Sequence, residues 1–116
     1  MNRRTIGKEK EELAASFLRD QGYRVIEKNF RCRAAEIDLI AWEGNILSFI
    51  EVKYRSSSKL GDPLEAVGPV KQKRIYEAAL YFISRKRIAS ETQMRFDVVS
   101  ILGEEITLIK NAFMIS

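Results

Sequence analysis

Residues 36–53 read EIDLIAWEGNILSFIEVK, and this stretch contains both a folding signal and a chemical one. Two runs rich in Ile, Leu, Val, Phe and Trp flank Gly44-Asn45, a dipeptide favoured in two-residue turns between antiparallel strands. The pattern therefore predicts a β-hairpin. Counting outward from this turn places Asp38 directly opposite Glu51 on the neighbouring strand.

Alternation of side chains along the two strands predicts one charged face and one apolar face. The charged face would carry Glu36, Asp38, Glu51 and Lys53, and the apolar face Ile37, Leu39, Ile50 and Val52. Two carboxylates facing each other across a ladder have Cβ atoms about 5 Å apart and repel. A divalent cation between them would relieve this repulsion, and carboxylate oxygens suit Mg²⁺ or Mn²⁺. The alternative interpretation is a pair of edge strands with a charged, solvated face.

The composition limits the chemistry that is available. The chain has 116 residues, enough for one domain with a core and too few for two. It has no histidine and a single cysteine, Cys32. These counts exclude Ser-His-Asp and Cys-His catalysis, zinc sites built on histidine or on several cysteines, and an internal disulfide. Hydrolytic chemistry would therefore depend on carboxylates, lysine and a hard metal ion.

Charge and hydropathy indicate the setting of the protein. The formal net charge of +4 and the pI of about 9.3 permit a phosphate-rich partner without requiring one. Residues 1–7 do not resemble a signal peptide, and no apolar run is long enough to cross a membrane. Together with the single cysteine, these features lead us to expect a cytoplasmic protein without membrane association.

The rest of the hydrophobic pattern predicts two helices and three further strands. The helices are expected at residues 7–21, ended by Gly22, and 70–87, and the strands at 23–30, 94–102 and 106–113. Residues 54–61 predict a loop, and 62–67 a short helical turn. The order α-β-β-β-α-β-β predicts an α/β fold, with a mixed sheet of about five strands flanked by helices in a single domain over 1–116.

Six basic residues stand where a nucleic-acid backbone could bind. The candidates are Arg31, Arg33, Arg55, Lys71, Arg74 and Arg85. The first two lie in an irregular connection over 29–35, the third follows the hairpin, and the last three recur along the second helix. Rows of positive charge neutralise phosphates. The alternative is a solvated loop and the ordinary water-facing side of an amphipathic helix.

The spacing of Asp38, Glu51 and Lys53 matches the PD-(D/E)xK nuclease pattern, with Ile37 in place of the proline. In this interpretation Asp38 and Glu51 hold the metal ion, which polarises a phosphodiester and lowers the pKa of bound water. Lys53, two residues further along the same face, orients that water and offsets charge on the phosphorane. Glu-x-Lys alone is a weak pattern, and the preceding aspartate and the hairpin make it stronger.

Five segments carry a wider resemblance over essentially the whole chain. They are Gly7-x-x-x-Glu11-x-x-Ala14-x-x-x-Leu18, Glu36-Ile37-Asp38-Leu39-Ile40, Phe49-Ile50-Glu51-Val52-Lys53-Tyr54-Arg55, Phe96-Asp97-Val98-Val99 and Asn111-Ala112-Phe113. Together they resemble the bacterial YraN family of endonuclease-like proteins. That family is similar in turn to the archaeal Holliday-junction resolvases of the restriction-endonuclease-like fold.

The resemblance implies a metal-dependent endonuclease acting on DNA, with branched or structured DNA as a candidate substrate and a homodimer as a candidate assembly. By the same likeness Glu11 joins Asp38 and Glu51 as a metal-binding acid, although an acidic residue early in a helix also suits the helix dipole. The family usually has glycine where Ala35 stands here. Gln72-x-x-x-Tyr76 also fits a short pattern found in some nucleases of this superfamily.

Two other functions remain open at this point. The first is a nucleic-acid-binding module that keeps the nuclease fold without efficient cleavage, and it predicts salt-sensitive DNA binding that survives loss of Asp38. The second is a protein-interaction adaptor, for which the sequence contains no specific signal. The complete set of Asp38, Glu51 and Lys53 favours the enzyme, since a purely structural descendant would not need all three.

Overall fold

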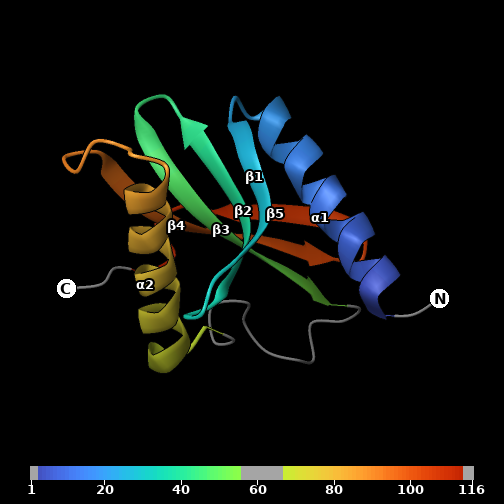
Figure 1. Cartoon of the computed structure of the whole chain (residues 1–116). Coiled ribbons are helices and arrows are strands. Elements are labelled where there is room, and N and C mark those ends of the chain that lie inside the picture. The colour runs from blue at the N-terminus through green and yellow to red at the C-terminus, as the bar shows by residue number, and fades with distance from the viewer. Residues whose placement is uncertain (1–2, 56–66, 114–116) are drawn as a thin grey trace.

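The computed structural model describes residues 3–55 and 67–113, which form a five-stranded sheet and two helices (Figure 1). The elements are α1 (Arg3–Asp20), β1 (Arg24–Arg31), β2 (Glu36–Glu43), β3 (Ile46–Arg55), α2 (Pro69–Arg85), β4 (Gln93–Leu102) and β5 (Glu105–Ile109). Their order is the predicted one, and the α/β class is confirmed. Residues 56–66, which contain most of the predicted loop over 54–61 and of the predicted turn over 62–67, lie outside the described residues. Residues 54 and 55, predicted to begin the loop, are the last two residues of β3.

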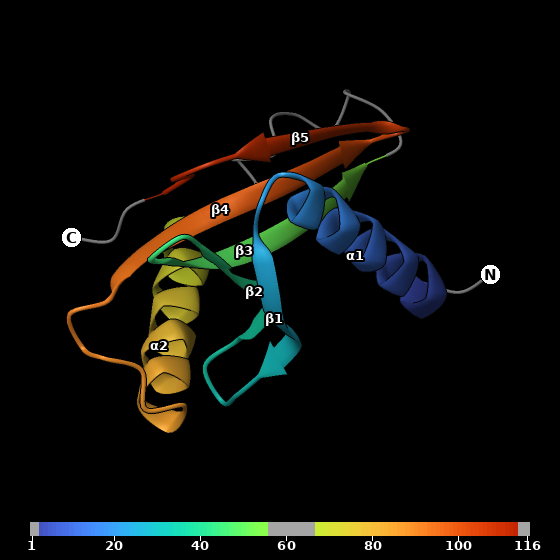
Figure 2. The same ribbon diagram turned by 90° about the horizontal axis from the view of Figure 1, so that it is seen from above.

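The sheet is mixed, and its spatial order follows the chain from β1 to β5. β1 pairs antiparallel with β2 and β2 with β3, β4 pairs parallel with β3, and β5 returns antiparallel to β4. A parallel pair requires a crossover, which is the segment that contains α2. Figure 2 shows the sheet twisted, with α1 and α2 packed against it in different places.

Two hydrophobic clusters hold the helices on the sheet. Beneath α1 the cluster combines helix residues such as Leu18 with Leu39 and Ile50 of the sheet. Beneath α2 it combines residues such as Phe82 with Phe49. Because β3 supplies residues to both clusters in alternation, it is the strand that both layers share.

The β2–β3 hairpin has the predicted register near its turn. Glu43 pairs with Ile46, and the ladder continues to Leu39 opposite Ile50. It ends there, one step before the predicted pairing of Asp38 with Glu51. The two acids still share a cavity, so their predicted proximity is confirmed even though the backbone ladder does not reach them.

Ile37 and Leu39 were predicted to lie on the same face of the sheet, and this prediction is wrong. The backbone twists between them, so their side chains point to opposite faces. Asn29 of β1 has a left-handed backbone, with φ of 52°. The preceding residue, Lys28, pairs with Glu12 of α1, whereas the following one, Phe30, packs edge-on against Phe82 of α2, although residues 28 and 30 would share a face in a regular strand. The paired residues in β2 follow, so Ile37 lies in the α2 cluster and Leu39 in the α1 cluster.

Several further boundaries differ from the prediction. β1 continues to Arg31, so this arginine lies in the strand and not in the predicted irregular connection over 29–35, and α2 ends at Arg85 and not at residue 87. α1 begins at Arg3, before the predicted start, and β5 ends at Ile109 instead of continuing to residue 113. Asn111 adopts φ of 54° and turns the chain back, so that Phe113 stacks on Phe96 with ring centroids 5.0 Å apart. An apolar residue that follows a strand pattern can thus leave the strand and pack against the hydrophobic core instead of extending the strand.

The buried carboxylate of Asp97, in the middle of β4, is hydrogen-bonded to residues outside this strand. Asp97 is fully buried and accepts hydrogen bonds from Arg95, Ser48 and Tyr23, the shortest being 2.6 Å from Ser48 Oγ. Arg95 also pairs with Glu43, at 2.7 Å. Burial alone would raise the pKa of Asp97, but these donors outweigh it and hold the pKa below its usual range.

Candidate active site

The candidate site is a cavity of about 510 Å³ formed by the start of β2, the middle of β3 and the first turns of α2. Its walls are formed by Ala34, Ala35, Glu36, Asp38, Glu51, Val70, Lys71, Arg74 and Ile75. Carboxylates therefore come from two strands, and cations from the first turns of the helix. The cavity brings together residues from position 34 to position 75 of the chain.

Asp38 is held in the cavity by the strand that faces it. Its Oδ2 accepts a hydrogen bond of 2.8 Å from the backbone N–H of Val52. Burial, and after it the nearby carboxylates of Glu51, Glu11 and Glu36, raise the pKa of Asp38 to about 7, against the opposing effect of the Val52 hydrogen bond. Near neutral pH the Asp38 carboxyl is therefore partly protonated, and a cation bound beside it would favour its fully ionised form.

Glu51 is nearly buried and carries two ammonium groups on one oxygen. Lys71 Nζ donates to Glu51 Oε1 at 2.8 Å, and Lys53 Nζ lies 3.3 Å from the same oxygen. Burial and the adjacent Lys71 hold the pKa of Lys53 below its ordinary value. The predicted pair of Glu51 and Lys53 is therefore in direct contact, with Lys71 as a third partner.

Glu11 reaches the same group of acids from α1. Burial raises its pKa above the usual value, and the charges of Glu36 and Glu51 act in the same direction, against a hydrogen bond with Asn29. Its Oε2 atom is buried and accepts no hydrogen bond within the described part of the chain. A buried carboxylate oxygen without a donor is costly, so this atom is poised to take a ligand.

The oxygen atoms of these acids are suitable ligands for a hard divalent cation, but they are not arranged as a preformed coordination site. Among residues 3–55 and 67–113, no three acidic, cysteine or histidine side chains are arranged as a complete metal-ligand set. A cation bound here would give the unpaired Glu11 oxygen a partner and favour the ionised form of Asp38, whose pKa burial and neighbouring carboxylates raise. Oxygen donors of this kind suit Mg²⁺ or Mn²⁺, so Asp38, Glu51 and Glu11 remain the candidate ligands.

The predicted nucleic-acid-binding residues divide into separate groups. Lys71 and Arg74 line the acidic cavity itself. Arg31 and Arg33 line a neighbouring cavity, whose wall includes Tyr81, and Arg85 bonds to the hydroxyl of Tyr81. Arg55, half-buried at the end of β3, lines neither of these two cavities.

Sequence reasoning placed Lys71 on the water-facing side of the helix and missed its bond to Glu51. A signal was available, because Lys71 stands four residues before Ile75, the first buried residue of the α2 stripe. Residues four apart share a helix face, so the Lys71 side chain is directed toward the sheet. The aliphatic stem of lysine tolerates such a partly buried position.

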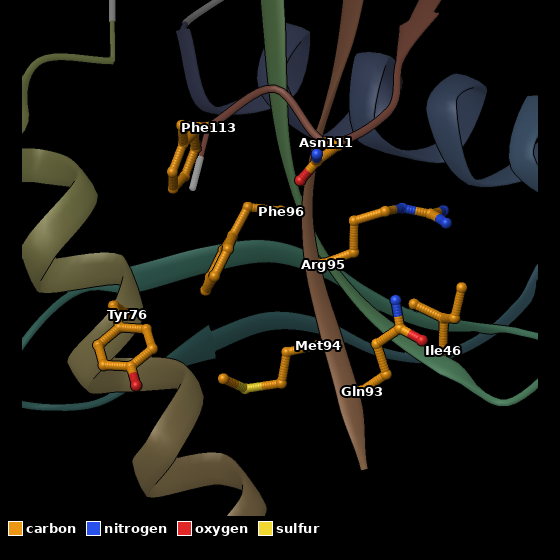
Figure 3. Close-up of a pocket in the computed structure, with 8 residues that line it drawn as sticks. All are labelled: Ile46, Tyr76, Gln93, Met94, Arg95, Phe96, Asn111 and Phe113. Carbon is orange, nitrogen blue, oxygen red and sulfur yellow. The ribbon is translucent and has the colours of Figure 1, made fainter. Parts of the chain in front are cut away.

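The other sequence details have local structural roles. Ala35 has no left-handed backbone, so its Cβ adds no backbone strain at the position where the resemblance led us to expect glycine. Gln72 Nε2 donates to the carbonyl of Val67 at 2.7 Å and so supports the start of α2. Tyr76 points into a different cavity of about 480 Å³, beside Met94, Phe96 and Phe113 (Figure 3). Gln72 and Tyr76 therefore do not act together at the acidic site.

Neither helix of the described chain is long and apolar enough to span a bilayer.

Comparison with known proteins places the chain among bacterial relatives of the same length. The profile of the family described as "Uncharacterised protein family UPF0102" matches residues 10–101. A UPF0102 protein of Lachnoclostridium phytofermentans is 48% identical over 113 residues, covering 97% of this chain and 96% of the relative. One of Caldicellulosiruptor saccharolyticus is 44% identical over 119 residues, covering 97% and 100%. The chain belongs to the UPF0102 family, also called the YraN family.

Proposed function

We propose that this protein is a metal-dependent endonuclease that hydrolyses DNA phosphodiester bonds. The observation that supports this most is the convergence of Glu11, Asp38 and Glu51 with Lys53 at one end of the sheet. Such a collection of like charges opposes folding, as the raised pKa values of Asp38 and Glu11 indicate. Asp38 and Glu51 share their cavity with Lys71, and perturbed carboxylates beside lysine are typical of catalytic sites.

Each side chain has a role that follows from its position. Asp38, Glu51 and Glu11 would hold Mg²⁺ or Mn²⁺, which when bound supplies a Lewis acid for the phosphodiester and an activated water. Lys53, beside Glu51, would orient the attacking water and stabilise negative charge on the phosphorane. Arg74, which lines the same cavity, would hold a phosphate of the DNA.

The test is cleavage of labelled four-way junction, flap, single-stranded and duplex DNA with Mg²⁺ or Mn²⁺. We expect metal-dependent cutting, and a loss of at least about 10²-fold in both Asp38→Asn and Lys53→Ala. Asp20→Asn and Lys86→Ala, which change exposed residues outside the cavity, serve as matched controls. Cutting that persists in both site variants would contradict the assignment of these residues.

A nucleic-acid-binding module without cleavage is the second candidate. It is favoured by the ammonium groups of Lys53 and Lys71, which already neutralise Glu51, and by the lack of a ready ligand set in the described chain. This function predicts DNA binding that weakens steeply with salt and survives Asp38→Asn. Salt-sensitive binding with no cutting of any substrate would support the module and overturn the enzyme.

We expect Lys71 to compete with the metal ion for Glu51. Two ammonium groups already lie within 3.3 Å of one Glu51 oxygen, so a divalent cation there requires one of them to leave. Lys71 is the more exposed of the two. Lys71→Met should therefore bind Mn²⁺ roughly three- to tenfold more tightly than the wild type, measured by titration calorimetry.

The matched control for this measurement is Lys73→Met, which removes an exposed lysine from the same turn of α2. It changes the net charge equally, so it corrects for long-range electrostatics. If both variants gain the same affinity, net charge explains the effect and Lys71 does not compete. If Lys71→Met loses affinity, the lysine supports the site instead of blocking it.

A further inference from the structure

A second cavity lies beside the acidic one and differs from it in charge. Its volume is about 350 Å³, and it is formed between the connection after β1 and the middle of α2. Its walls are Arg31, Cys32, Arg33, Ala34, Glu77 and Tyr81. Ala34 lines both cavities, and the ion pair between Arg31 and Glu36, at 3.4 Å, joins their walls. A ligand in this cavity would therefore be the immediate neighbour of a group bound at Asp38 and Glu51.

The aromatic wall of this cavity is exposed yet fixed in place. Tyr81 is 47% exposed, although aromatic rings of this size usually bury most of their surface. Arg85 donates to its hydroxyl at 2.9 Å, and the ring of Phe30 lies 6.1 Å away at an angle of 33°. Because the ring is already ordered, a flat ligand could stack on it without a large entropy penalty.

The charges of the cavity define how a ligand would be oriented. Arg31 and Arg33 are both exposed and line this cavity. A guanidinium group can donate two parallel hydrogen bonds to two oxygens of one phosphate. Glu77 of α2 is the acidic residue of the wall. Its carboxylate would repel a phosphate and accept a hydrogen bond from the exocyclic amine of a base. A phosphate would therefore lie toward the arginines, and a base toward Glu77 and Tyr81.

We infer that this cavity binds one unpaired nucleotide of the DNA strand, next to the phosphate held in the acidic cavity. The inference rests on the proposed nuclease function and names its substrate class. A base within a duplex is already stacked and paired, so only an unpaired nucleotide can present its face to Tyr81. The preferred substrates are therefore flaps, junctions and single strands, with the unpaired nucleotide beside the bond to be cut.

The test compares two labelled flap duplexes that differ only in the bases of the flap, one normal and one abasic. Their phosphate charge is identical, so a difference in affinity reports base contacts. We expect the wild type to bind the normal flap about tenfold more tightly, by fluorescence anisotropy in EDTA, where the DNA stays intact. Tyr81→Leu should remove this difference, whereas Tyr81→Phe, which keeps the ring, should retain it.

Two further variants separate base from phosphate contacts. Leu80→Ala changes the exposed neighbour of Tyr81 and should keep the tenfold difference. Arg33→Gln should weaken both flaps about equally and reduce the salt dependence of binding. The inference is overturned if the wild type binds both flaps equally, or if Tyr81→Leu still distinguishes them.

The outcomes also separate this inference from the proposed function. Metal-dependent cutting that requires Asp38, without tighter binding of the normal flap, would contradict the proposed nucleotide site and support the proposed nuclease function. If the protein binds none of these DNA molecules, even at low salt, both proposals are contradicted.

Discussion

Asp38→Asn should stabilise the metal-free protein by roughly 2–4 kcal/mol at pH 8, although it removes the central acid of the proposed site. The reason is that burial and the surrounding carboxylates raise the pKa of Asp38 to about 7, against 3.8 for the ordinary side chain. Above pH 7 the folded chain must hold this carboxylate ionised. Asparagine keeps an oxygen for the Val52 N–H and carries no charge.

The pH dependence of this effect has a defined sign. Below about pH 4 the carboxyl is protonated in both the folded and the unfolded chain, so it contributes no difference. Between pH 4 and 7 the folded chain retains a proton that the unfolded chain releases, and wild-type stability therefore falls as the pH rises through this window. The advantage of Asp38→Asn should appear over the same window and level off above it.

Urea unfolding at pH 5 and pH 8 in EDTA measures this prediction, with Asp20→Asn as the exposed control. Adding Mg²⁺ at pH 8 should stabilise the wild type and narrow its gap to the variant, because a ligand that binds only the folded state adds to its stability. An unchanged or lower stability of Asp38→Asn at pH 8 would show that the acid is not under strain.

Arg95→Met should destabilise the protein by about 3–5 kcal/mol, the largest loss that we expect from a single substitution. Arg95 bonds to both oxygens of Asp97, which is fully buried. Without the guanidinium, Asp97 would remain in the core as an unpaired charge or take up a proton. Glu43, which Arg95 also contacts, would keep Lys110 as a partner.

Thermal unfolding of Arg95→Met beside Arg24→Met, an exposed arginine of β1, tests this. The double variant Arg95→Met with Asp97→Asn should recover part of the loss, since it removes the charge that was left unpaired. Arg95→Met should also lose the acid sensitivity that Asp97 confers, because a carboxylate whose pKa is held low stabilises the fold fully above its ordinary pKa and loses this contribution as the pH falls through the lower pKa of the folded state. A loss of similar size in Arg24→Met would contradict the role of the buried pair.

Much of this architecture can be predicted from hydrophobic period and turn chemistry. Gly44-Asn45 set the register of the central hairpin, and the order of helices and strands followed from the pattern alone. The shared cavity of Asp38 and Glu51 is a consequence of that register. These features depend on local rules, which a single sequence contains.

The features that could not be predicted depend on backbone conformation and on distant packing. A left-handed Asn29 has the same sequence signature as any strand asparagine, yet it moves Ile37 to the other layer. Phe113 resembles the end of a strand until the turn at Asn111 is known. The contact between Lys71 and Glu51 depends on where the crossover helix lies, which no local pattern specifies.

The topology also sets the order in which the chain can assemble. β1, β2 and β3 form a meander of neighbours in sequence, and β4 and β5 form a separate hairpin. The parallel pairing of β3 with β4, in contrast, joins residues such as Ser48 and Arg95, which are 47 positions apart in the chain. Closing so long a loop is slow compared with forming a hairpin. We therefore expect the carboxylates of Asp38 and Glu51 to meet early in folding, and Lys71 to reach them only when the crossover closes.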